Sequence, residues 1–247
     1  MAAATAIGPR LGKFTGKRRE ARPFFGHSLP LSVIGAWLLV FGWFGFNVGS
    51  SAANDPQTIN VELAWVGVTT AMAMAGGLFG VAVTSRGHAL TSMTGLLSGA
   101  VAICSGAAMM HPLFAFLTGL VAGVLTTFSQ GILEQILHVD DACVCVPVHA
   151  VNGFWGILAT GLFGARFLGA HPLYGVLTVE EWVHLIAVQL LGASTIALWA
   201  GATGLALFLG IKKVGLLRAS KDAELFGLDI AEHKTYAYPE DMQEQFP

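Results

Sequence analysis

Charged residues are scarce in this chain, and their scarcity decides its class. Asp, Glu, Lys and Arg together make up 11% of the 247 residues, whereas about a quarter of an average soluble domain is charged. Hydrophobic residues supply 54% of the sequence. So much apolar side chain must face lipid or other apolar helices, which excludes an ordinary water-soluble domain.

Cysteine is also scarce, and its spacing indicates neither a disulfide framework nor a zinc site. The chain has three cysteines, Cys104, Cys143 and Cys145. Residues i and i+2 of a helix point to different sides, so Cys143 and Cys145 cannot bind one metal ion together. We predict no metal, no cofactor and no nucleic-acid partner for this chain.

Six apolar runs are long enough to cross a bilayer, since about 20 residues at 1.5 Å each span a hydrocarbon core of ~30 Å. The runs are about Pro30–Gly49, Glu62–Thr84, Leu90–Met110, Leu113–Leu137, Cys143–Ala165 and Trp182–Ile211. We therefore predict an all-α membrane protein with six transmembrane helices and the lipid bilayer as its surroundings.

Glycines recur at helical spacing inside these runs, as in the pairs Gly95 and Gly99, and Gly119 and Gly123, and in the cluster Gly76, Gly77 and Gly80. Small residues at this spacing let helix backbones approach closely in a bilayer. The glycines predict a compact bundle and carry no information about activity.

The Lys and Arg residues lie almost entirely on one side of the predicted bundle. They flank the first and last spans at Arg10, Lys13, Lys17, Arg18, Arg19, Arg22, Lys212, Lys213, Arg218, Lys221 and Lys234. Arg86 falls on the same side, and only Arg166 falls opposite. Because cytoplasmic loops carry the basic excess, we predict a multi-pass protein of the cell membrane with both termini cytoplasmic.

This arrangement divides the chain into three regions. Residues 1–28 form a basic cytoplasmic N-terminal segment, residues 29–212 the six-helix transmembrane domain, and residues 213–247 a cytoplasmic C-terminal tail.

One of the eight histidines differs from the others in its position. Seven lie in loops or at span ends, where water reaches them: His27, His88, His111, His138, His171, His184 and His233. His149 lies inside the fifth span, eight residues after Asp141, which predicts a depth of about 12 Å. An ionisable residue at membrane depth suggests a pore or proton-relay role; a packing histidine bonded to a neighbouring helix is the alternative.

The residues around His149 predict how its helix begins and which face it presents. Either Asp140 or Asp141 is expected to cap the helix, and Pro147, about two turns in, to bend it or to leave a carbonyl unpaired. Cys145 one turn before His149, and Asn152 and Gly153 one turn after it, predict a stripe of small and polar side chains.

The outer end of the first span has an unusual composition. Between Gly42 and Ser51, aromatic residues alternate with glycine, asparagine and serine. Aromatic residues at a membrane interface are most often belt residues. Aromatic faces next to hydroxyl oxygens would also suit a small cation, through cation–π contact and hydrogen bonding.

Several segments resemble the Amt/Mep/Rh ammonium transporters. The segment Gly42–Ser50 reads GWFGFNVGS, and Asp140–Phe163 reads DDACVCVPVHAVNGFWGILATGLF. The tail segments Gly215–Arg218 and Gly227–His233 resemble the family's C-terminal signature, and Gly8–Lys13 its cytoplasmic loop between helices five and six. The resemblance covers essentially the whole chain and identifies it as a member of this family of transporters, which are not enzymes.

The resemblance implies roles for individual residues. Phe46 matches a phenylalanine that gates the outer pore mouth, and Ser50 matches a serine of the external ammonium site. His149 matches one of two pore histidines, and Cys145 occupies a pore-lining position. The two aspartates that precede the histidine helix match a structural acidic pair. The tail resembles an element that contacts neighbouring subunits near the docking site of a PII-type regulator.

The resemblance also implies a partial fold. The family has eleven helices, as two inverted halves plus a long last helix, and this chain matches helices six to eleven, the second inverted repeat with that last helix. We expect a half-length or truncated form that contributes one wall of an ammonium or ammonia pore. It would act in a homotrimer or with a first-half or full-length subunit.

Two other functions remain open from the sequence. The chain could be a non-conducting regulatory or partner subunit of ammonium transporters. It could also be an intramembrane hydrolase with Ser105 as nucleophile and His149 as base, which requires the two side chains to lie within hydrogen-bond reach.

Overall fold

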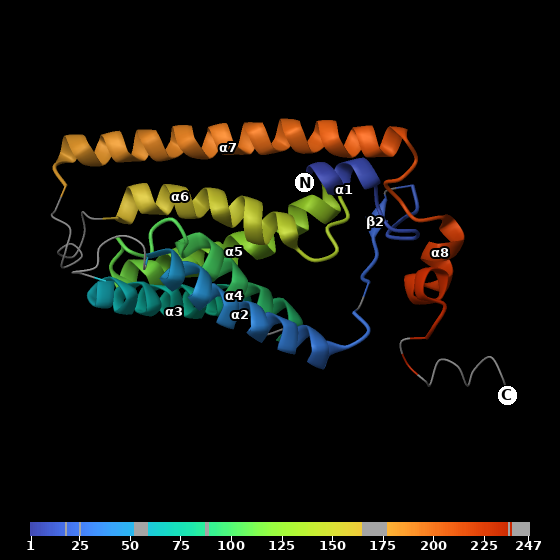
Figure 1. Cartoon of the computed structure of the whole chain (residues 1–247), viewed down its shortest axis with the longest axis horizontal. Helices are drawn as coiled ribbons and strands as arrows, with labels where there is room; N and C mark the ends of the chain where they lie inside the picture. The colour runs from blue at the N-terminus through green and yellow to red at the C-terminus, as the bar shows by residue number, and fades with distance from the viewer. Residues whose placement is uncertain are drawn as a thin grey trace. The chain divides into compact units, whose positions relative to one another are not determined.

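The computed structural model describes residues 1–17, 19–24, 26–51, 59–86, 89–164, 177–236 and 238. Long helices dominate it (Figure 1). They are α2 (Leu29–Ser51), α3 (Ile59–Thr84), α4 (Ala89–Ile103), α5 (Pro112–Gln135), α6 (Asn152–Phe163) and α7 (Val179–Lys213). A π-helix, η1 (Val146–Val151), leads directly into α6. The sequence analysis placed His88 and His171 in loops and Arg166 opposite the other basic residues. These three residues lie outside the described part of the chain.

The remaining elements are short and belong to the ends of the chain. They are α1 (Ala2–Ile7), a two-stranded antiparallel hairpin of β1 (Phe14–Thr15) and β2 (Glu20–Ala21), α8 (Lys221–Phe226) and a second π-helix, η2 (Asp229–His233).

Each of the six predicted apolar runs contains a helix, but the third is shorter than predicted. Five described segments are long and apolar enough to cross a membrane, with η1 and α6 counted as one. The third run was expected to reach Met110, yet α4 ends at Ile103 and residues 104–109 form turns. The hydroxyl of Thr69 donates a hydrogen bond of 2.7 Å to the carbonyl of Ala107 in this turn segment. An internal partner of this kind satisfies a backbone group that has left the helix.

The chain divides into two compact units. The terminal unit comprises Met1–Phe24, His138–Asp140 and Ala200–Pro247, and the helical unit comprises Phe25–Leu137 and Asp141–Trp199. Helix α7 contributes its first 21 residues to the helical unit and the rest to the terminal unit.

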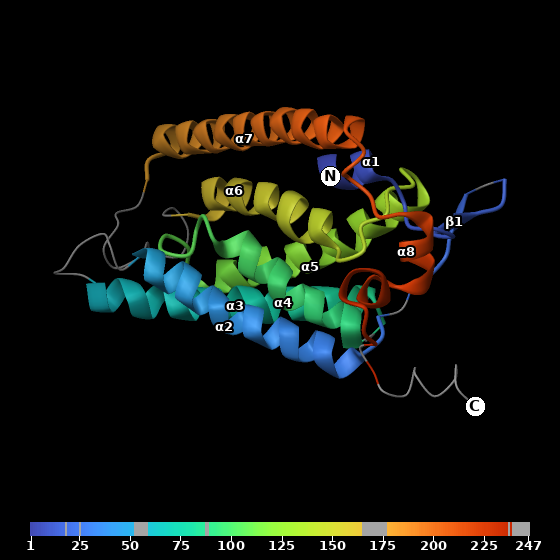
Figure 2. The same ribbon diagram turned by 45° about the vertical axis from the view of Figure 1, so that its right-hand side comes forward.

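The centre of the helical unit is α3, which packs against α4 and α5; the three lie side by side in both views (Figures 1 and 2). Glycines make this packing close, as the sequence predicted. A Cβ atom on Gly77 would overlap the carbonyl oxygen of Gly95 in α4, and one on Gly119 in α5 would overlap that of Ala73 in α3. Only residues without a side chain fit there, which is the packing expected between helices in a bilayer.

Burial is unequal among the membrane-spanning helices. Half of the apolar span of α3 is buried, against 11% of that of α2 and 6% of that of α7. Large apolar side chains such as Leu38, Phe41 and Trp199 are exposed on α2 and α7. These faces require lipid or further helices to cover them.

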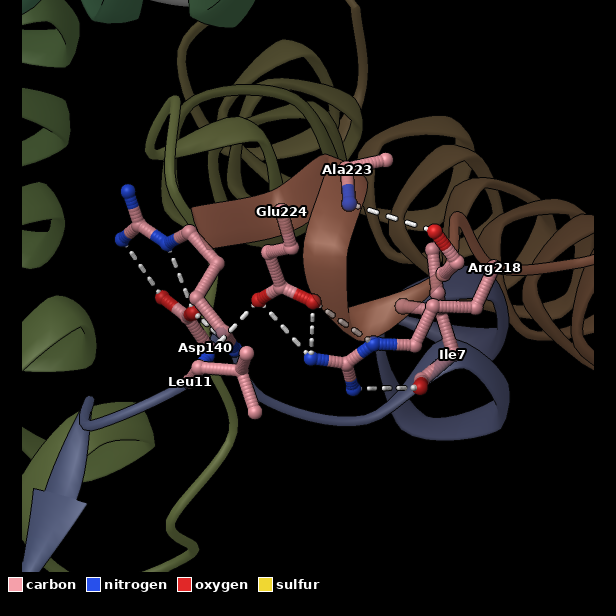
Figure 3. A network of polar contacts seen from close by, with 8 residues as sticks. Ile7, Leu11, Asp140, Arg218, Ala223 and Glu224 are labelled. Carbon is pink, nitrogen blue, oxygen red and sulfur yellow. Dashed lines mark hydrogen bonds and ion pairs between the residues drawn. The ribbon is translucent and has the colours of Figure 1, made fainter. Parts of the chain in front are cut away.

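The terminal unit holds the two ends of the chain together through polar contacts (Figure 3). The ammonium group of Lys212 donates to the carbonyl of Ala6 (2.7 Å), and the guanidinium of Arg218 donates to that of Ile7 (3.3 Å). Glu224 accepts from the backbone N–H of Leu11 (2.7 Å) and pairs with Arg218 at 2.8 Å. N-terminal residues Ala6, Ile7 and Leu11 are therefore bound to the last turn of α7 and to the segment that follows it.

Candidate functional site

The helix that carries His149 begins later than predicted. Asp141 caps it: one carboxylate oxygen accepts from the N–H of Cys145 (3.0 Å) and the other from that of Val146 (2.6 Å). Asp140, the other aspartate considered as a cap, instead forms an ion pair with Arg10. The expected helix start near Asp141 is wrong by about four residues: Val144 has a left-handed backbone (φ 57°), and the helix begins only after Cys145.

This later start changes the positions of Pro147 and His149. Pro147 is the second residue of η1, where proline is tolerated because its missing N–H has no intrahelical partner. The predicted position of Pro147, two turns into the helix, is therefore wrong. His149 is the fourth residue of η1, so the depth of about 12 Å that was counted from Asp141 is not supported by the helix itself.

His149 and the aromatic residues of α2 form one row. The indole of Trp43 stacks on the imidazole of His149 with ring centroids 6.2 Å apart, and Trp43 also lies 6.2 Å from the ring of Phe46. The indole N–H donates to the sulfur of Cys104 at 3.2 Å, which fixes the ring between its two neighbours. Trp43 was part of the quoted motif but was not singled out; its i, i+3 spacing to Phe46 was the signal that could have found it.

The four residues singled out from the sequence are all exposed in this chain. Phe46 is 62% exposed, and Ser50, Cys145 and His149 are exposed as well. The hydroxyl of Ser50 donates to the carbonyl of Phe46 one turn earlier. No residue within the described part of the chain hydrogen-bonds to the His149 side chain, so the packing role considered for this histidine has no partner there.

Asn47 sets the face that α2 presents. Its side chain is buried and donates to the hydroxyl of Thr70 in α3 at 3.1 Å. A buried amide needs such a partner, so α2 is held with Asn47 inward and Phe46 outward. Beside them lies a pocket of about 290 Å³ whose lining includes Phe46, Ser50, Glu62 and Ser105. Glu62 is 2% exposed and was not singled out from the sequence.

Asn152 does not belong to the predicted polar stripe. It is fully buried and donates to the hydroxyl of Thr126 at 2.7 Å, which also lies 2.7 Å from the hydroxyl of Ser98. The stripe was drawn with 3.6 residues per turn, whereas a π-helix has i→i+5 hydrogen bonds and a wider turn. The change of period turns Asn152 away from the face that carries Cys145 and His149.

Ser105 and His149 are not brought together as a catalytic pair. The hydroxyl of Ser105 lies 2.8 Å from that of Thr160, and the contact of His149 is with Trp43. The hydrolase hypothesis therefore lacks its nucleophile–base hydrogen bond. Within the described residues, no three His, Cys, Asp or Glu side chains gather into a metal site.

Comparison with known proteins identifies the family of this chain. The sequence matches the Ammonium Transporter Family over residues 1–238. The chain belongs to this family of membrane transporters. Ammonium transporter Amt1 of Methanocaldococcus jannaschii is 39% identical over 97% of this chain and 57% of that protein. Ammonium transporter Amt2 of Archaeoglobus fulgidus is 37% identical over 97% of this chain and 52% of that protein.

The fold agrees with the family. A solved structure described as a sensor Amt protein superposes with a TM-score of 0.81 at 30% identity, covering 94% of this chain and 55% of that one. The predicted resemblance to ammonium transporters, and the membrane helices that it implied, are thus confirmed. The chain spans about half the length of the curated relatives it matches.

Proposed function

We propose that this chain forms one wall of a pathway for ammonium or ammonia across the cell membrane. The observation that carries the proposal is the row in which half-buried Trp43 lies between exposed Phe46 and exposed His149, on a chain that spans about half of its relatives' length. Side chains with gating and hydrogen-bonding chemistry face outward here, and the additional residues of the longer relatives would supply the facing wall. Midplane sites in transporters built from inverted repeats lie between the two repeats.

The chemistry of the row suits a small solute that changes its charge. An ammonium ion would be recruited beside Phe46 and Ser50, where an aromatic face and a hydroxyl oxygen favour a cation. A bare charge is costly in an apolar channel, so the ion would lose its proton before it proceeds, and the proton would be released to water at the outer mouth or would follow separately. Neutral ammonia would then pass along His149, whose ring can donate or accept one hydrogen bond. Cys145 would line the path on the other side of His149.

The same proposal covers orientation and assembly. Both termini are proposed to lie in the cytoplasm. The positive-inside rule supports this orientation. The contacts of Lys212 and Arg218 with residues near the N-terminus support placing both termini on one side. The assembly is proposed to be a homotrimer or a complex with a first-half or full-length subunit. A PII-type regulator would meet it at the cytoplasmic tail.

The test compares the chain with and without a complementary wall. The chain is expressed alone or together with the first half of the Methanocaldococcus jannaschii relative, and uptake of labelled methylammonium is measured per amount of folded protein. We expect no uptake by the chain alone, because Phe46 and His149 then face lipid, and saturable uptake by the pair.

His149→Ala provides the specific control, with His184→Ala in α7 as the matched histidine variant. Removing the imidazole should lower normalised flux or selectivity, and His184→Ala should leave both near wild type. Unchanged normalised flux in His149→Ala would refute its role in the pore. A pair that assembles but never conducts would instead favour a non-conducting partner subunit.

A further inference from the structure

The terminal unit contains a pocket separate from the proposed pathway. Its volume is about 480 Å³, and four basic side chains line it: Arg10 and Arg19 from the N-terminal segment, and Arg218 and Lys221 from the segment after α7. The ring of Phe14 contributes an apolar wall. No carboxylate is among the described residues that line this pocket.

Two of these four cations are already neutralised. Arg10 donates hydrogen bonds of 2.8 Å to the carboxylate of Asp140 from Nε and from a terminal guanidinium nitrogen. Arg218 forms an ion pair with Glu224 at 2.8 Å. Figure 3 shows Asp140, Arg218 and Glu224 in this network. Burial acts to raise the pKa of Asp140, but the hydrogen bonds and charge of Arg10 outweigh it and hold the pKa below its usual value. Both carboxylates are therefore ionised near neutral pH.

The other two cations are not neutralised by a carboxylate in the described part of the chain. Arg19 lies over the ring of Phe14 at 5.5 Å, and Lys221 is exposed at the first position of α8. Four positive charges and the two paired negative charges leave an excess of two positive charges around the cavity. A cavity with an excess of one sign raises the local concentration of ions of the other sign.

We propose that this pocket binds a phosphate group carried by a larger molecule. Guanidinium and ammonium groups are the side chains that recognise phosphate, arginine through paired N–H donors and lysine as a point charge. The cavity exceeds what inorganic phosphate needs, and its apolar wall suits the rest of an organic phosphate. The phosphate can come from a soluble metabolite or from the headgroup of an anionic phospholipid, and basic segments next to a membrane helix attract the latter.

Binding would act on the two ends of the chain at once. The described residues that line the pocket come from the N-terminal segment and from the segment after α7: Pro9, Arg10, Leu11, Gly12, Phe14 and Arg19, and Arg218, Ala219 and Lys221. A phosphate bridging Arg19 and Lys221 would cross-link these segments, so it should raise the unfolding midpoint and protect the tail from protease.

The experiment uses the full chain in nanodiscs of neutral phosphatidylcholine. In one arm, pyrophosphate is titrated at constant ionic strength, and in the other, phosphatidylglycerol replaces part of the lipid. The thermal midpoint and the rate of tail proteolysis are followed in both arms. A saturable effect of pyrophosphate assigns a soluble phosphate compound, and an effect of phosphatidylglycerol alone assigns a lipid headgroup.

The variants separate the pocket from general charge. Arg19→Gln combined with Lys221→Gln should weaken the apparent affinity at least about tenfold, since charged hydrogen bonds to the phosphate are lost. Lys17→Gln removes one charge from the same hairpin outside the pocket and should change the affinity less than about twofold. If the double variant folds poorly, the loss of apparent affinity is measured with Lys221→Gln alone. Absence of a saturable effect in both arms, or equal losses in Lys17→Gln and the pocket variants, would overturn the proposal.

Discussion

The indole of Trp43 stacks on the imidazole of His149, with ring centroids 6.2 Å apart and ring planes inclined by 23°. This contact joins α2 to the π-helix η1 and orients an imidazole that has no hydrogen-bond partner among the described residues. The hydrogen bond from the indole N–H to Cys104 extends the link to the residue just after α4. Trp43 therefore positions the ring on which the proposed conduction depends.

Truncation of Trp43 should separate its two contacts. Trp43→Phe keeps an aromatic face for His149 and loses only the N–H to sulfur contact, so normalised flux with the complementary half should stay within about twofold of wild type. Trp43→Ala loses both contacts and should destabilise the helical unit by about 2–4 kcal/mol, somewhat below the full cost of deleting a buried tryptophan.

Flux and thermal midpoint are measured on the same preparations of both variants. The expected order of normalised flux is wild type, Trp43→Phe, then Trp43→Ala. Equal fluxes in all three would show that Trp43 has no positioning role.

The sequence predicted the long helices well because each is an unbroken apolar run. Helix α3 begins three residues before the predicted Glu62 and ends at the predicted Thr84. The early end of α4 could not be read from its sequence, since the apolar run continues through Ala107 and Ala108. The turn after α4 depends on the hydroxyl of Thr69, 38 residues away in the chain.

The candidate site was less predictable for a similar reason. Ser50, Phe46 and His149 were found from local motifs, but the partner of His149 lies on another helix. The orientation of Asn152 depends on the π-helical period of η1, which no local motif of the sequence announced. Local periodicity assumes a uniform α-helix and therefore placed Asn152 on the wrong face.

Substitution by alanine should have opposite effects on stability at two glycines of α5. A Cβ on Gly119 would overlap the carbonyl oxygen of Ala73, so Gly119→Ala should force α3 and α5 apart and cost about 1–3 kcal/mol or more. Gly131 has nothing within 4 Å of its Cβ position. Gly131→Ala should be neutral or stabilise by up to about 1 kcal/mol through helix propensity.

Thermal midpoints of the two alanine variants in the same nanodiscs test this contrast. Gly131→Ala controls for insertion of a methyl group into α5. Equal midpoints would mean that α3 and α5 are not in backbone contact at Gly119.

Asp141 should control both stability and the position of His149. Asp141→Ala leaves the N–H groups of Cys145 and Val146 without their carboxylate and should cost about 1–2 kcal/mol. Asp141→Asn keeps one acceptor oxygen and should cost about half as much. Because η1 begins at this cap, normalised flux with the complementary half should fall in the same order, and full flux in a destabilised Asp141→Ala would show that the cap does not position His149.

The ion pair of Arg10 with Asp140 should make the stability of the terminal unit depend on pH. Burial raises the pKa of Asp140, but hydrogen bonds from the guanidinium and N–H of Arg10 prevail and lower it. A lowered folded-state pKa gives stability that is present above the unfolded value of about 3.9 and lost as pH falls through the folded value. The side chains are 38% and 3% exposed, so Asp140→Asn should cost about 1–2 kcal/mol at pH 7, between exposed and buried pairs.

The measurement follows tail proteolysis and the unfolding midpoint between pH 3 and pH 7 for wild type, Asp140→Asn and the exposed control Asp222→Asn. Wild type should exceed Asp140→Asn by a constant margin above about pH 5, because the carboxylate is fully ionised there in both the folded and the unfolded chain. The margin should shrink below about pH 4, as protonation removes the charge that Arg10 binds. Asp222→Asn should track wild type throughout. A margin that persists unchanged at pH 3 would mean that the stabilisation does not come from the ionised carboxylate.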